Sequence, residues 1–126
     1  MAIQSVRTVE GPLCIVRAHG DSTLVDAVDF IRRNIDLCRA ERIGKLLINV
    51  AGVTAVPMPT LVDRFLAAED WAHASDGRVA VALVTDSAYI HPQKFGVKAA
   101  SHFGLSMEIY PHEADALAWL AERRTE

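Results

Sequence analysis

The sequence has few cysteines and no long hydrophobic run, and each shortage argues against a class of protein. Its two cysteines, Cys14 and Cys38, form no C-x-x-C motif and fall within apolar patterns, which predicts buried free thiols in a reducing compartment. No apolar run approaches the ~20 residues that a membrane span needs. The opening residues, MAIQSVRT, contain no long apolar stretch, so we expect no signal peptide and a cytoplasmic protein.

The sequence also lacks a strong charge of either sign. It has 13 basic and 16 acidic residues and a net charge of −3, which gives no electrostatic reason to expect nucleic acid or an anionic membrane as a partner. Neither of the two glycine-rich phosphate motifs, G-x-x-x-x-G-K-[ST] and G-x-G-x-x-G, occurs, and the five histidines have no metal-site spacing such as H-x-x-H. We therefore expect no metal and no cofactor.

What the sequence does have is an alternation of strand-like and helix-like patterns. Residues 3–9 and 13–18 are two strand-like runs separated by a Glu-Gly-Pro turn, which is typical of a hairpin. Later patterns alternate between helix and strand, giving the order β-β-α-β-α-β-α-β-α. This order predicts one domain, residues 1–126, of the α/β class, with a single mostly parallel sheet and helices packed against it.

The helical pattern that follows residue 60 has an apolar stripe at helical spacing. The positions of the stripe are Leu61, Val62, Phe65, Leu66, Ala68 and Ala72. We expect Thr60 to be the N-cap of this helix, with Asp63 three residues on as a weak capping-box partner.

The stretch NVAGVTAVPMPT, residues 49–60, connects a strand expected at residues 45–50 to that helix. In an α/β protein, the turn at the carboxyl end of a strand is where a functional site usually lies. This turn contains no acid, base or strong nucleophile. Two prolines hold Met58 on a rigid turn, where it is either a contact residue for a protein or an apolar ligand, or a hydrophobic staple against the helix below.

Three segments carry a resemblance to a known family. They are VRAHGD at residues 16–21, LLINVAGVT at residues 46–54 and ALAWL at residues 116–120, the last one after a strand ending in Ile-Tyr. With the element order, they make the chain resemble the STAS domain, the SpoIIAA-like fold of bacterial anti-sigma-factor antagonists and of the cytoplasmic tails of sulfate transporters. The resemblance, closest to small stand-alone bacterial members, implies a regulatory domain that binds protein and is not an enzyme.

The same resemblance bears on the turn before the helix. In phospho-regulated antagonists the loop carries Asp-Ser-Ser-Gly, and a serine at the helix N-terminus accepts phosphate, which the free N–H groups there favour. Laid against that motif, this sequence has Pro57-Met58-Pro59-Thr60. The resemblance therefore implies a member without the usual phospho-acceptor serine, and it leaves open a modification at Thr54 or Thr60.

Two hypotheses on function involve binding. The first is a protein partner, or a second copy of the chain, bound through the surface around residues 57–66. The second is a small apolar or lipid-like ligand, by analogy with the related architecture of CRAL-TRIO lipid-binding domains. It would need an apolar cavity beside Val56, Met58 and Tyr89. The residues predicted to contact partner or ligand are Thr54, Pro57, Met58, Pro59, Thr60, Asp86 and Ser87.

The third hypothesis is a hydrolase-like enzyme. Ser87, His91 and Asp86 lie beyond the end of a predicted strand and could serve as nucleophile, base and orienting acid. The sequence has no G-x-S-x-G elbow around the serine. We therefore predict that the protein is not an enzyme.

Overall fold

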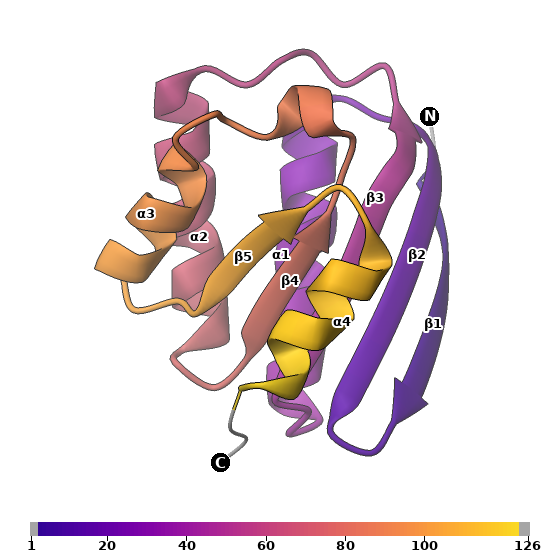
Figure 1. Cartoon of the computed structure of the whole chain (residues 1–126). Coiled ribbons are helices and arrows are strands. Elements are labelled where there is room, and N and C mark those ends of the chain that lie inside the picture. The colour runs from indigo at the N-terminus through magenta and orange to yellow at the C-terminus, as the bar shows by residue number, and fades with distance from the viewer. Residues whose placement is uncertain (1–2, 124–126) are drawn as a thin grey trace.

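Five strands and four α-helices make up the computed structural model, which describes residues 3–123 (Figure 1). The strands are β1 Gln4–Glu10, β2 Leu13–Asp21, β3 Lys45–Thr54, β4 Ala80–Val84 and β5 Met107–Tyr110. The helices are α1 Leu24–Ala40, α2 Leu61–Ser75, α3 Phe95–His102 and α4 Glu113–Ala121, with a short 3-10 helix, η1, at Ser87–Tyr89. Residues 1, 2 and 124–126 of the predicted domain lie outside the described part of the chain.

The strands form one sheet in the order β1-β2-β3-β4-β5. β1 pairs with β2 in the antiparallel sense, as the Glu-Gly-Pro turn predicts, and the other three pairs are parallel. The α/β class, the mostly parallel sheet and the predicted element order are thus confirmed. All five residues of β4 are buried, as expected of a central parallel strand covered on both faces.

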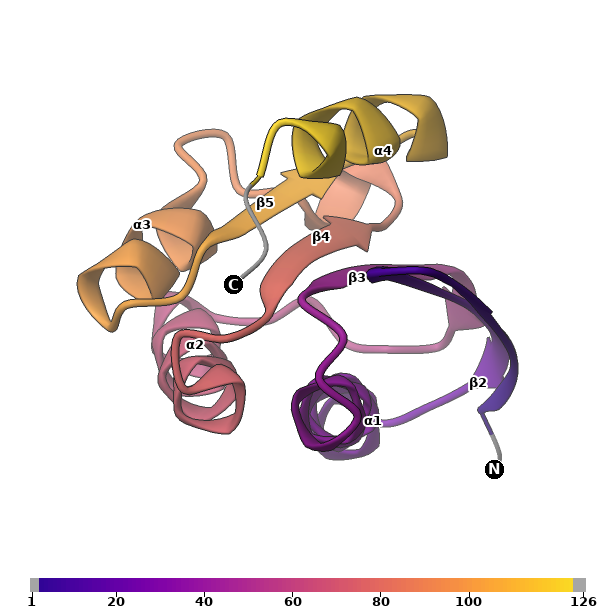
Figure 2. The ribbon, with the colours of Figure 1, turned by 90° about the horizontal axis from the view of Figure 1, so that it is seen from below.

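Helices cover both faces of the sheet, which is seen end-on in Figure 2. α1 and α2 lie on one face, α4 lies on the other, and α3 sits beside α2 and β5. Because side chains of a strand alternate in direction, Ile48 belongs to the larger core under α1 and α2, whereas Leu47 belongs to the smaller core under α4. The sheet therefore divides the interior into two apolar layers.

β2 and β3 are both longer than predicted, because their ends pair with each other. After a register shift between Arg17 and His19, the pairing continues to Asp21 and Thr54. Gly52 permits this close approach, since a Cβ on it would lie 2.8 Å from the Ala18 carbonyl oxygen. The first six residues of the stretch 49–60 are therefore strand, and residues 55–60 form the connection to α2.

The apolar stripe predicted for α2 is buried only in its second half. Ala68 and Ala72 are buried as expected, but Leu61 is 51% exposed and Phe65 is 40% exposed. The ring of Phe65 meets Phe103 edge-on, with 5.2 Å between the ring centroids. The buried face of α2 thus combines Ala68 and Ala72 of the stripe with Ala67 and Trp71, while the first half of the stripe lies within the surface at residues 57–66 that the first binding hypothesis names.

Candidate functional site

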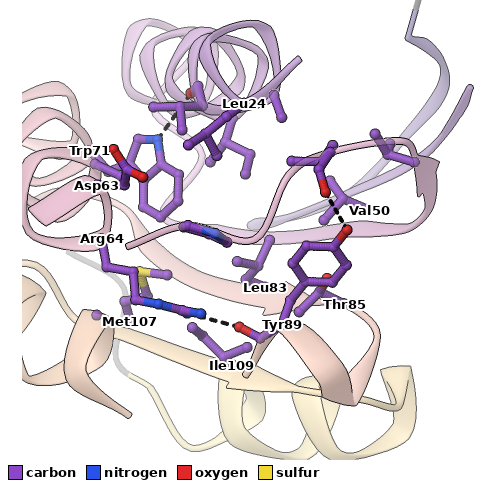
Figure 3. A pocket seen from close by; sticks show the side chains of 18 residues that line it. Leu24, Val50, Asp63, Arg64, Trp71, Leu83, Thr85, Tyr89, Met107 and Ile109 are labelled. Carbon is purple, nitrogen blue, oxygen red and sulfur yellow. Dashed lines mark hydrogen bonds between the residues drawn. The ribbon is translucent and has the colours of Figure 1, made fainter. Parts of the chain in front are cut away.

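The loop between β3 and α2 is fixed to its surroundings by hydrogen bonds (Figure 3). The Tyr89 hydroxyl of η1 donates to the Val56 carbonyl oxygen over 2.6 Å, and Arg64 Nη1 of α2 donates to the Tyr89 carbonyl oxygen over 2.8 Å. At the end of the loop, Thr60 Oγ1 accepts from the Asp63 N–H (3.0 Å), and Asp63 Oδ2 accepts from the Thr60 N–H (2.9 Å). The predicted capping box is confirmed, and the loop, η1 and α2 are connected.

Large apolar side chains are exposed on this loop and on the first turns of α2. They are Met58, 54% exposed, Leu61, 51%, Val62, 66%, Phe65, 40%, and Leu66, 55%. We call these five residues the α2 surface. Single exposed apolar residues are common, whereas large contiguous apolar patches are typical of interaction surfaces.

An apolar cavity of about 130 Å³ lies on the opposite, inner side of α2. It is bounded by α1, α2, the sheet and the loop, and its side chains are drawn in Figure 3. Val56 and Tyr89 line it, as the ligand hypothesis requires, whereas Met58 is not part of its lining. The cavity and the α2 surface therefore lie on different sides of the same helix.

The predicted contact residues fall into three groups. Residues 57–60 form the loop, and Asp86 and Ser87 lie at the start of η1, which the Tyr89 bonds connect to that loop. Asp86 is engaged as the N-cap of η1, where its Oδ1 accepts from the Ala88 N–H over 2.9 Å. Thr54 is the last residue of β3, and its hydroxyl donates to Asp21 of β2 over 2.7 Å. Thr54 is thus directed toward β2.

The groups of the hydrolase hypothesis are not assembled into a catalytic relay. His91 Nδ1 accepts from the Gln93 N–H over 3.1 Å, and Asp86 serves as a helix cap. Within residues 3–123, no hydrogen bond joins Ser87 to His91 or His91 to Asp86. The geometry of this region is that of a turn.

The described residues contain neither a candidate metal-binding group nor a candidate membrane-spanning helix. In the described part of the chain, no three His, Cys, Asp or Glu side chains are grouped so that they could hold a metal ion. Of the helices between residues 3 and 123, none has both the length and the apolar character to cross a membrane.

Both cysteines are free and fully buried, as predicted. Burial and the neighbouring Cys14 raise the pKa of Cys38 to about 12. Because the thiolate is the reactive form of cysteine, Cys38 is a core residue with no nucleophilic role at neutral pH.

One residue of this region, Arg64, was missed by the sequence reasoning; it bridges α2 to η1. The helical spacing of Trp71 is typical of a packed residue, and the structure buries Trp71, whose Nε1 donates to the Val28 carbonyl oxygen of α1 over 3.1 Å. Nothing in the sequence distinguishes Arg64 from a solvated helix residue, since its partner is a backbone carbonyl of a distant segment.

Solved structures share this architecture. An anti-sigma factor antagonist from Mycobacterium paratuberculosis matches with a TM-score of 0.61 and 14% identity, over 96% of both chains. The anti-sigma factor antagonist SpoIIAA, in its unphosphorylated form, matches with a TM-score of 0.53 and 15% identity, over 97% of this chain and 100% of SpoIIAA.

A third structure is an uncharacterised protein of the DUF3478 family from Shewanella loihica PV-4, described as having a SpoIIAA-like fold. It matches with a TM-score of 0.51 and 16% identity, over 94% of this chain and 93% of that one. No protein-family model matches the sequence, and no curated protein matches it. At these identities the likeness concerns the fold: the chain has the STAS-like, SpoIIAA-like fold of anti-sigma factor antagonists.

Proposed function

We propose that this protein is a non-catalytic regulatory domain that binds a protein partner through the α2 surface. The observation that carries the proposal is the exposure of five large apolar side chains on the loop and the first turns of α2. Removing apolar area from water contributes about 25 cal/mol per Å², and a few such anchors supply most of the affinity of an interface. The capping box and the Tyr89 bonds hold these anchors in place before binding, which reduces the ordering cost of association.

The fold supports a particular kind of partner. Two of the structurally similar proteins are named anti-sigma factor antagonists. We therefore propose that the partner is a regulatory protein of the anti-sigma factor kind and that the two proteins bind in the cytoplasm. A second copy of this chain is the alternative occupant of the same surface. The two are distinguished by whether the purified protein is monomeric in solution.

We propose further that the loop does not work as the usual phosphorylation switch. Residues 57–59 are Pro-Met-Pro and carry no hydroxyl group. The hydroxyl of Thr60 caps α2, and that of Thr54 donates to Asp21. Binding is therefore expected to be constitutive, controlled by the amount of the partner and not by a phosphate at this loop.

The proposal is tested by a pair of matched substitutions. Val62 on the α2 surface is 66% exposed, and Val6 on β1 is 67% exposed, so Val62→Glu and Val6→Glu place the same charge on equally exposed sites. A partner is first identified by co-purification from the native host and then purified. We expect Val62→Glu to weaken its affinity at least tenfold, because a carboxylate must lose its water at the centre of an apolar contact.

Val6→Glu is the control and should bind as the unmodified protein does, and both variants should unfold at about the same denaturant concentration. Equal affinity of the two variants would show that the partner uses another surface. A dimer by analytical ultracentrifugation, dissociated by Val62→Glu and not by Val6→Glu, would assign the α2 surface to self-association and overturn the anti-sigma-factor kind of partner.

A further inference from the structure

We propose that the cavity between α1, α2 and the sheet is a binding site for one compact apolar molecule, about the size of an aromatic ring. Its volume is about 130 Å³. An engineered apolar cavity of about 150 Å³, lined by similar side chains, stays dry and binds benzene. This volume matches one small, compact molecule, so the proposal replaces the broader apolar or lipid-like class considered above with a compact ligand.

The lining of the cavity favours an apolar ligand. Aliphatic side chains come from α1, from three strands of the sheet and from the loop. They include Leu24, Val28, Ile31, Val50, Val53, Val56, Leu83 and Ile109. The Trp71 ring and the Met107 side chain complete the wall, and both offer polarisable surface to an aromatic molecule.

The polar groups of the lining are mostly engaged with the protein itself. Tyr89, Arg64, Asp63 and Trp71 each have a hydrogen-bond partner in the loop or in a neighbouring element. A strongly polar ligand would have to break these bonds. The hydroxyl group of Thr85, a buried residue of the lining, is available to form a hydrogen bond with one polar group of the ligand. The ligand class is therefore a hydrocarbon or an aromatic ring with at most one polar substituent.

The cavity lies in a core that is otherwise shielded from solvent. Val16, Ile35 and Ile48 of the same core are fully buried, and protein interiors are usually closely packed. Empty apolar space lowers stability, and a ligand that fills it recovers the lost contacts. Binding at this site goes beyond the proposed protein interaction, because the α2 surface lies on the other side of the helix.

The protein contains its own reporters for a test with benzene. Met107 lines the cavity, whereas Met58 is exposed on the α2 surface. Of the two tryptophans, Trp71 lines the cavity, and Trp119 of α4 packs against the core on the other face of the sheet. The protein is labelled with ¹³C at its methionine methyl groups and uniformly with ¹⁵N. Titration with benzene should then shift the NMR signals of the Met107 methyl group and the Trp71 indole N–H until binding saturates. Trp119 should not move, and glycerol should shift none of the four. Met58, whose sulfur lies 3.6 Å from Nη2 of the cavity-lining Arg64, should shift much less than Met107.

A cavity-filling substitution provides a second test of benzene binding. Ala67 is a buried residue of the lining on α2, and Ala118 is exposed on α4. Ala67→Leu should weaken benzene binding at least tenfold, and Ala118→Leu, the matched control, should leave it unchanged. Ala27→Leu, which enters the cavity from α1, replaces Ala67→Leu if that variant does not fold.

Two results would overturn the proposal. One is the absence of any saturable shift of Met107 in the unmodified protein up to the solubility limit of benzene. The other is binding that persists undiminished in a folded cavity-filling variant, which would place benzene elsewhere.

Discussion

At the scale of single residues, Glu113 accepts three side-chain hydrogen bonds from two strands. Arg17 donates to both of its carboxylate oxygens, from Nε over 2.9 Å and from Nη2 over 2.8 Å, and Asn49 Nδ2 donates over 2.7 Å. These bonds from Arg17 and Asn49 lower the pKa of Glu113. One carboxylate thus joins β2 and β3 to the first turn of α4, where the helix dipole also favours a negative charge.

This lowered pKa makes part of the stability depend on pH. Because the folded state holds the proton of Glu113 less tightly than the unfolded state does, its contribution is fully present above the ordinary carboxyl pKa of about 4.3. The contribution is lost as the pH falls through the folded-state value. We expect Glu113→Gln to lower the free energy of unfolding by about 1 kcal/mol at pH 7, and by less below pH 4.

Urea denaturation at several pH values measures this difference. Glu10→Gln, on exposed β1, is the control and should leave stability nearly unchanged at every pH. A Glu113→Gln effect of the same size at pH 7 and at pH 3 would contradict the role assigned to the ionised carboxylate.

At the scale of elements, the two sides of α2 differ in what they present. Its inner side, with Ala67 and Trp71, faces α1 and the cavity, and its outer side carries the α2 surface. The start of the helix determines how both sides are presented, because the capping box at Thr60 and Asp63 satisfies N–H groups that a helix leaves free.

Substitutions of Thr60 test whether its hydroxyl group caps α2. Thr60→Ala removes the oxygen that accepts from the Asp63 N–H and should lower the free energy of unfolding by about 1 kcal/mol. Thr60→Ser keeps that oxygen and should cost much less. Chemical denaturation of the unmodified protein, Thr60→Ala and Thr60→Ser measures the three free energies of unfolding. Equal stabilities of Thr60→Ala and the unmodified protein would show that the hydroxyl is not needed as a cap and is free for another use.

At the scale of the whole molecule, local sequence patterns were enough to predict the fold class. Hydrophobic spacing and turn residues depend on neighbours in the chain, so the element order and the hairpin could be derived from them. The ends of β2 and β3 could not, because residues 52–54 become strand only through their pairing with residues 19–21. The close approach at Gly52 is a contact between segments far apart in sequence.

The position of the loop between β3 and α2 could be predicted from the sequence, but the arrangement of the residues around it could not. The loop at residues 57–60 follows from the parallel topology, since loops at the carboxyl ends of strands share one edge. Helical spacing cannot tell a core stripe from an interface stripe, so Leu61 and Phe65 belong both to the predicted apolar stripe and to the predicted binding surface at residues 57–66. The cavity depends on how α1, α2 and the sheet meet in space, which no local pattern encodes.

The central claim is that the α2 surface is where a protein partner binds, and methionine methyl NMR tests it most directly. The purified partner is added to ¹³C-methyl-labelled protein, in which Met58 reports on the α2 surface and Met107 on the interior. We predict that the Met58 signal shifts or broadens as the complex forms while the Met107 signal stays in place. A complex that forms with the Met58 signal unchanged would contradict the claim.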